Sequence, residues 1–300
     1  MWELLLSPPI FASLIVQGLA LGAMYALMGV GLALTFGVLG IVNFAHGEFF
    51  MIGSYVMYFA AAMLGLPIPL AIVLAGAVVF VFSAAVERGP IEQLRKRSDR
   101  NWVSDTFVLT IGLSIVLQSL AQNLFGTNQY GILELVGGAV PIGEIRISGD
   151  RLFLLATAIL IGLATWLFLK YLTLGKGIRA ASQSVDAAET LGIDVRWMGT
   201  ITFALGGALA GHAGALLITI YPASPTVGAG PLVQSFAVVL LGGLGSVPGA
   251  ILAGLLIGVL ESFISFLTSS GWQNVLLNYL VIAVLLVRPA GLFVIKGHRP

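Results

Sequence analysis

Long apolar runs, separated by short polar segments, dominate the pattern of the chain. Each run has spanning or near-spanning length for a bilayer. The runs are unbroken and about twice as long as the ~10-residue alternating segments of a membrane β-barrel. Backbone groups in lipid must be paired internally, and unbroken runs do this as helices. The pattern predicts helices at about 10–40, 49–64, 68–87, 105–125, 152–171, 200–221, 229–245, 249–268 and 273–288.

The predicted fold is therefore an all-α integral membrane protein with a single domain over 1–300, a bundle of about 8–10 transmembrane helices. Run 10–40 is long enough for a tilted helix or a broken one. Run 229–245 is short and fits either a re-entrant segment or a thin crossing, of which we favour the crossing. Glycines at close helical spacings fill these runs, and small residues let membrane helices approach closely. We therefore expect a tightly packed bundle.

Composition supports a membrane location. Mean hydropathy is +1.04 and 9% of residues are charged, whereas soluble domains carry about 25%. The chain has no cysteine, which excludes disulfides and thiolate metal sites. His46 is far in sequence from His212 and His298, so no metal site is expected. The first apolar run is too long for a signal peptide, and no positive segment precedes it, so no cleavable signal is expected.

The basic residues give an orientation. If each run crosses once, all of the fourteen Lys and Arg except Arg146 and Arg151 fall on one side. Excess Lys and Arg mark the cytoplasmic side, which places the N-terminus outside. The cytoplasmic set is Arg88, Arg95, Lys96, Arg97, Arg100, Lys170, Lys176, Arg179, Arg196, Arg288, Lys296 and Arg299.

The segment at about 172–199 is a cytoplasmic loop too polar to span the membrane. A short helix is expected from Asp186 to Leu191, with Gly192 as its C-terminal cap, and another at 177–184. Such a loop can receive force from a soluble motor, or it can lie on lipid headgroups as an interfacial helix. Spacing alone leaves both interpretations open.

Five motifs occur in order along the chain. They are Asn-Phe-Ala-His-Gly-Glu at 43–48 with Met-Ile-Gly-Ser-Tyr at 51–55, Thr-Ile-Gly-Leu-Ser-Ile-Val-Leu-Gln at 110–118, the glycine-rich loop at 175–193, Leu-Gly-Gly-Leu-Gly-Ser-Val-Pro-Gly at 241–249, and Arg-Pro-x-Gly-Leu-Phe at 288–293. With these motifs the chain resembles the LivH-type permeases of ATP-binding-cassette (ABC) importers for branched-chain amino acids. The resemblance covers about 14–293.

The resemblance implies a type II ABC importer permease fold and half of a translocation pathway, with alternating access driven by other subunits. It implies a heterodimer with a second related permease, two cytoplasmic ATPases and an extracytoplasmic solute-binding protein, in the cytoplasmic (inner) membrane of a bacterium or archaeon. The solute would be a branched-chain amino acid, urea, an amide or a similar small polar molecule. No partner role for nucleic acid is implied; lipid surrounds the chain.

No Gly-x-x-x-x-Gly-Lys-Ser/Thr phosphate loop occurs in the sequence, so no nucleotide site is expected on this chain. The chain is then not an enzyme and binds no cofactor, and its partner ATPases use the ATP and magnesium. The resemblance points to residues of the cytoplasmic loop as the contact with those ATPases. They are Gly175, Arg179, Asp186, Leu191 and Gly192.

Asn43, His46 and Glu48 lie between two apolar runs, where ionisable groups are expensive and usually face protein or water. The break can present polar groups to a pathway, as discontinuous helices do in transporters. It can equally be a hydrogen-bonded turn at a membrane edge.

Thr110, Ser114, Gln118 and Gln122 recur every four residues and form a polar stripe on one helix face. The stripe can line a path or hold neighbouring helices together. Gln234 is similar but isolated.

The rival function is an ion-coupled secondary transporter of small solutes that uses His46, Glu48 and Glu261 as ion sites. For Glu261, satisfaction inside the core is the simpler expectation. No clustered nucleophile, base or metal set indicates an intramembrane enzyme.

Overall fold

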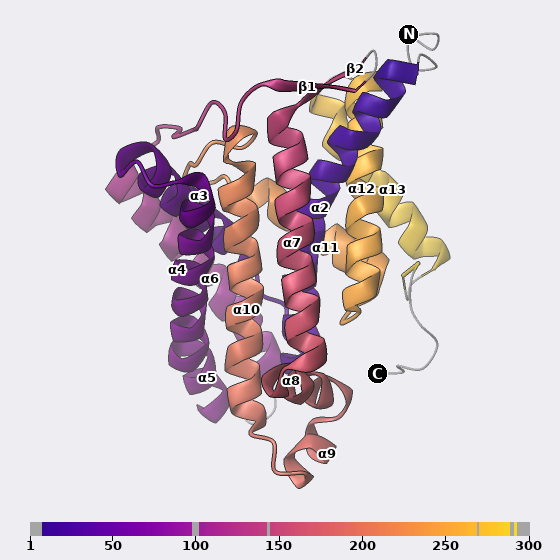
Figure 1. The fold of residues 1–300 in the computed structure, drawn as a ribbon. Helices are drawn as coiled ribbons and strands as arrows, with labels where there is room; N and C mark the ends of the chain where they lie inside the picture. Colours follow the sequence, from indigo (N-terminus) through magenta and orange to yellow (C-terminus); the bar gives the residue numbers. More distant parts are fainter. Residues whose placement is uncertain (1–7, 98–101, 143–144, 269, 289–290, 293–300) are drawn as a thin grey trace.

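The computed structural model describes residues 8–97, 102–142, 145–268, 270–288 and 291–292. Its helices lie side by side in one bundle (Figure 1). The elements are α2 (Pro8–Leu39), α3 (His46–Met57), the π-helical turn η1 (Tyr58–Met63), α4 (Ile68–Val86), the π-helical turn η2 (Glu87–Ile91), α5 (Glu92–Arg97), α6 (Trp102–Phe125), β1 (Ala139–Ile142), β2 (Ile145–Ser148), α7 (Gly149–Tyr171), α8 (Thr173–Gln183), α9 (Val185–Thr190), α10 (Val195–Leu216), the 3-10 turn η3 (Leu217–Thr219), α11 (Ala229–Gly242), α12 (Val247–Leu267) and α13 (Ser270–Val287).

Every predicted apolar run is helical. Among the described residues, six helices are long and apolar enough to span a membrane, namely α2, α4 with its extension to Arg97, α6, α7, α10 and α12. The apolar stretches of α11 and α13 are shorter. Run 10–40 is one helix of 32 residues rather than a broken pair. The predicted helical membrane fold is confirmed, although fewer helices have the length of a full membrane span than the nine apolar runs suggested.

The segment that contains α11 runs back along the bundle from the end of α10 to the start of α12. α10 runs antiparallel to α2, because Gly199 contacts Leu39 and the later Gly206 contacts the earlier Gly31. α12 does the same, because Gly254 contacts Ala26 and the later Val259 contacts the earlier Gly18. The link between two parallel helices has to run back against their direction. α11 has only 14 residues, which is about 21 Å at 1.5 Å per residue. The segment 220–228 before it forms the first part of the link.

α3 begins inside the bundle, beside the start of α11. His46 Nε2 lies 3.2 Å from the Met28 carbonyl oxygen, midway along α2. A Cβ atom on Gly47 would lie 2.7 Å from the Gly228 oxygen, just before α11. Residues 40–45 lead back into the bundle from the end of α2. Two discontinuous helices therefore start next to each other, well inside the protein.

Glycines bring the helix backbones into contact, as the sequence predicts. A Cβ atom on Gly22 of α2 would lie 2.8 Å from the Gly254 oxygen on α12, and one on Gly31 would lie 2.7 Å from the Gly206 oxygen on α10. These contacts leave no space for a side chain. α2 is therefore held between α12 and α10 by direct backbone contact.

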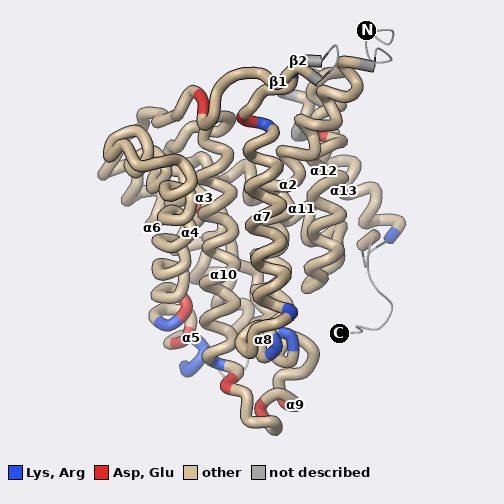
Figure 2. The backbone as a smooth tube through the Cα atoms, in the orientation of Figure 1, with Lys and Arg blue, Asp and Glu red and all other residues tan. Residues whose placement is uncertain are grey.

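Charged residues gather at the two ends of the bundle (Figure 2). The end with α5, α8 and the start of α10 carries Arg88, Arg95, Lys96, Arg97, Lys170, Lys176, Arg179 and Arg196, and the opposite end carries Arg146 and Arg151. Arg288 follows the end of α13. Arg100, Lys296 and Arg299 lie outside the described residues. The bundle therefore has one strongly basic end, as the sequence predicts.

A small β-hairpin departs from the all-α expectation. β1 and β2 pair antiparallel at the less basic end, with Val140 opposite Ile147. The Asp150 Oδ1 atom accepts the backbone N–H groups of Leu135, Val136 and Gly137 at 3.0–3.4 Å. These strands have four residues each, too short for a readable alternation, so periodicity gave no signal.

We expect Gly254→Ala to destabilise the bundle, because the new methyl group would meet Ala26 Cα at 2.7 Å. Such overpacking costs about 1–3 kcal/mol. Gly162→Ala on α7 is the matched control, since no atom lies within 4 Å of its added Cβ, and it is expected to be neutral or stabilising by up to about 1 kcal/mol. Thermal unfolding in detergent measures both. Equal melting temperatures would contradict the close-contact assignment.

Candidate translocation path and coupling surface

A buried carboxylate lies at the start of α3. Glu48 is 3% exposed, and its Oε1 accepts a hydrogen bond from Gln118 Nε2 of α6 at 2.6 Å. The same amide nitrogen lies 3.3 Å from Ser114 Oγ. Within the described part of the chain, Glu48 Oε2 has no hydrogen-bond partner. An unpaired buried charged oxygen is costly, so this atom is available to a ligand or water.

The polar stripe of α6 faces the start of α3. The Phe44 backbone N–H donates to Thr110 Oγ1 at 3.3 Å, and Ser114 and Gln118 continue toward Glu48. Gln122, the last member, is exposed. Thr110 therefore contacts the break before α3, Gln118 contacts the first turn of α3, and Ser114 lies between them on α6.

Asn43 and His46 are satisfied inside the break. Asn43 Oδ1 accepts the Ala45 N–H at 3.0 Å, and His46 lies against the Met28 carbonyl. Both side chains are buried. This is the geometry of a hydrogen-bonded turn, although it lies within the bundle and not at its edge. Gln234 is also buried, on α11. A path-lining role for these three residues stays a prediction.

Glu261 belongs to a separate cluster. Its Oε1 accepts hydrogen bonds from Tyr25 Oη at 3.3 Å and Gln273 Nε2 at 2.8 Å, and the Tyr221 hydroxyl lies 3.4 Å from that of Tyr25. One oxygen is therefore satisfied inside the core, as expected, whereas among the described residues Glu261 Oε2 has no hydrogen-bond partner. Across the described residues, no group of three or more His, Asp or Glu side chains could hold a metal ion.

The polar loop at 172–199 forms α8 and α9 at the basic end (Figure 1). Ser184 caps α9 by accepting the Ala187 N–H at 3.2 Å, so α9 begins at Val185, one residue before the predicted start at Asp186. Gly192 has a φ of +78° and ends the turn as predicted. α8 is longer than expected, and α10 already begins at Val195.

The predicted coupling residues differ in exposure. Leu191 is 78% exposed at the tip between α9 and α10, and Asp186 and Gly192 are exposed beside it. Arg179 Nη2 donates to the Lys170 carbonyl at 3.3 Å. Gly175 is buried, because its backbone packs directly on the Phe168 carbonyl of α7. It therefore supports α8 from within.

Sequence reasoning missed a polar network above this loop. Glu87 is buried in the π-helical turn after α4. It pairs with Arg95 of α5 and accepts a hydrogen bond from Thr200 Oγ1 of α10 at 2.6 Å. The Arg88 guanidinium lies 4.4 Å from the centre of the Trp197 ring. The start of α10, next to Leu191, is thus tied to α4 and α5. The charged 87–97 stretch was visible in the sequence, but its partner on α10 was not.

Comparison with known proteins identifies the class. The family model of the branched-chain amino acid transport system permease component matches residues 14–287. The chain is 32% identical over 286 residues to the high-affinity branched-chain amino acid transport system permease LivH of Salmonella typhimurium, covering 92% of this chain and 93% of LivH. It is 33% identical to BraD of Pseudomonas aeruginosa (93% and 94% covered), and 27% identical to a probable LivH of Methanocaldococcus jannaschii (89% and 87% covered).

The chain is a multi-pass membrane transport protein, and it belongs to the branched-chain amino acid transport system permease family. It is a permease subunit of an ABC importer. The resemblance drawn from the five motifs is confirmed, and the ion-coupled secondary transporter is set aside. The comparisons assign no role to individual residues.

Thr200→Val should lower stability, because it removes the hydroxyl that donates to buried Glu87. Leaving such an acceptor unpaired costs about 1–3 kcal/mol. Thr165→Val is the matched control, a buried threonine on α7 that bonds only the Ile161 carbonyl of its own helix. Thermal unfolding of the two purified variants tests this. If Thr200→Val melts no lower than Thr165→Val, the Glu87 bond contributes nothing.

Proposed function

We propose that this chain forms half of a translocation path for branched-chain amino acids or similar small polar solutes, with a second, related permease as the other half. The observation that carries the proposal is the buried Glu48 carboxylate at the shared start of two discontinuous helices. Discontinuous helices place polar groups at substrate sites in the membrane interior of transporters. The transport described for LivH and BraD supports the class of solute.

The proposed path follows the junction of α3 and α6. Glu48, Gln118, Ser114 and Thr110 supply polar groups there. Asn43 and His46 fix the backbone of the break behind them, and Gln234 lies on the adjoining α11. A carboxylate with one bonded and one free oxygen suits a solute that brings its own N–H donors.

Two ATPase subunits, which bind the ATP and magnesium, would dock on the basic end. The proposed contact is the α9 tip, with Leu191 and Gly192 at its centre and Asp186 and Arg179 around it. Leu191 places a mostly exposed apolar side chain at the tip, where a docked subunit would cover it. Rotation of the ATPases would push this tip and rock α10, to which it is joined.

The basic end would face the cytoplasm, since Lys and Arg mark that side. The opposite end would then receive solute from an extracytoplasmic binding protein. This orientation corresponds to the cytoplasmic membrane of a bacterium or archaeon, in a complex of two permeases, two ATPases and the binding protein.

This chain, co-expressed with the second permease and the ATPases and supplied with the binding protein, should give ATP-dependent leucine uptake into membrane vesicles. This chain alone should give none. Leu191→Glu should abolish retention of the ATPases in a pull-down and reduce uptake at least about tenfold, the effect of losing 1.4 kcal/mol of contact. Uptake that survives without ATPase subunits would contradict the proposal.

Leu133→Glu provides the matched control for the pull-down. Leu133 is a leucine that is 96% exposed, and it lies in the loop before the β-hairpin at the other end of the bundle. The same charge placed there should leave the ATPases bound. Equal loss from both variants would show a general effect of the added charge and would refute the coupling contact.

A further inference from the structure

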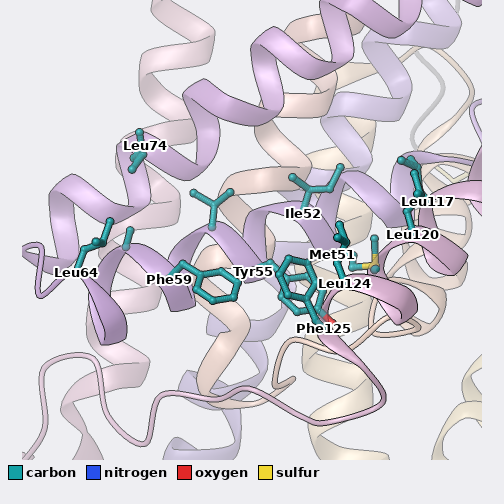
Figure 3. A pocket seen from close by; sticks show the side chains of 13 residues that line it. Met51, Ile52, Tyr55, Phe59, Leu64, Leu74, Leu117, Leu120, Leu124 and Phe125 are labelled. Carbon is teal, nitrogen blue, oxygen red and sulfur yellow. The ribbon is translucent and has the colours of Figure 1, made fainter.

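An apolar groove of about 400 Å³ lies between α3, η1, α4 and α6. Figure 3 shows Tyr55 and Phe125 at its centre, with Ile52 and Met51 toward one side and Leu64 and Leu74 toward the other. The lining is apolar apart from one hydroxyl group. Ligand sites are typically cavities of this size, mostly apolar with a few placed polar groups.

That hydroxyl group lacks a partner. Tyr55 is 4% exposed, its ring stacks on Phe125 at 4.4 Å between centroids, and among the described residues its Oη is buried without a hydrogen bond. A buried hydroxyl normally finds a partner, because leaving it unpaired costs about 1–3 kcal/mol. A polar molecule in the groove would supply what the chain does not.

The groove adjoins the Glu48 carboxylate. Ile52 is one helical turn beyond Glu48 on α3, and Tyr55 is two turns beyond it. On α6, the lining residue Leu117 precedes Gln118, the residue that bonds Glu48. Since α3 runs from the interior toward the less basic end, the groove occupies that half of the bundle, and its inner lining residues Met51 and Ile52 follow Glu48 within about one helical turn. Both partnerless oxygens, on Tyr55 and on Glu48, thus lie along one strip of α3.

A second cavity of about 400 Å³ gives the comparison. It lies between α2, α7, α10 and α12, and its lining includes Ile159 and Thr165. The Thr165 hydroxyl already bonds the Ile161 carbonyl, and within the part of the chain that the structure describes, no residue lining this cavity has a buried polar side-chain atom without a partner. Acyl chains would satisfy such a cavity fully. They would leave the Tyr55 hydroxyl unpaired in the groove between α3 and α6.

We propose that the groove between α3 and α6 is the outer half of the solute path, where the Tyr55 hydroxyl and then the Glu48 carboxylate bind the ammonium group of a small aliphatic amino acid. The apolar side chain of the solute lies against the groove wall. This inference rests on the proposed function and adds to it the place and the order of contact.

The two polar groups act in succession. Glu48 and Tyr55 are seven residues apart on one helix, which places their Cα atoms about 10 Å apart along its axis. A solute that moves inward along α3 therefore meets the hydroxyl first and the carboxylate second. Weak contacts at several positions let a solute move on, whereas one strong site would retain it.

The chain has no cysteine, so a single introduced cysteine reports on its own surroundings. In the full complex in proteoliposomes, Leu124→Cys in the groove should react with a water-soluble methanethiosulfonate reagent. Saturating leucine should slow this reaction about tenfold, which corresponds to about 1.4 kcal/mol of protection by bound leucine. Ile159→Cys in the second cavity is the control and should react slowly with or without leucine. Leu120→Cys provides a second groove position if Leu124→Cys does not assemble.

Two results would overturn the proposal. Groove cysteines that react no faster than Ile159→Cys would show that lipid or the second permease fills the groove. Reaction without protection by leucine would show a water-filled groove that is not on the path. Failure of the proposed function is a different result, namely that the complex without substitutions shows no ATP-dependent leucine uptake at all.

A substitution that keeps the shape of the site gives an independent check. Tyr55→Phe should lower leucine uptake per ATP hydrolysed several-fold, because it removes only the hydroxyl. Tyr58→Phe on η1, which does not line the groove, should leave the ratio unchanged. Equal ratios for the two variants would argue against a contact between Tyr55 and solute.

Discussion

Direct backbone contact between helices is the constraint on which this structure depends. In lipid, apolar side chains gain little by leaving the solvent, so helix association relies on close packing and polar contacts. Here α2 touches α12 through Gly22 and Gly254, and α10 through Gly31 and Gly206. These contacts fix α2 as the axis of the bundle. α3 and α11, which start midway along that axis, inherit their positions from it, and with them the place of Glu48.

The same constraint explains where polar groups can be tolerated. A carboxylate inside the bundle survives only where a neighbouring helix supplies a donor, and α6 supplies Gln118 to Glu48. At the basic end, α10 supplies Thr200 to Glu87. The first pair lies at the break between helices, and the second lies beside the loop that would meet the ATPases.

Much of the architecture could be predicted from local sequence. Apolar runs gave the helices, the basic residues gave the two ends, and Gly192 gave the end of α9. The α6 stripe was visible as well, but its partner was not, because Gln118 and Glu48 are 70 residues apart and periodicity carries no information about which helices pack together. The Glu87 network spans 113 residues between Glu87 and Thr200 and was missed for the same reason. Tyr55 was seen only as part of a motif, since a missing hydrogen-bond partner becomes apparent only in three dimensions.

The loop before the β-hairpin has one further consequence. The single Asp150 oxygen that gathers three backbone N–H groups holds residues 135–137 in one conformation. A protein that docks on this end of the bundle would meet a surface that is already ordered. Association costs free energy whenever loops must be immobilised, and here that cost is met during folding of the permease. A partner can then reach a given affinity at this end with fewer contacts than a flexible loop would require.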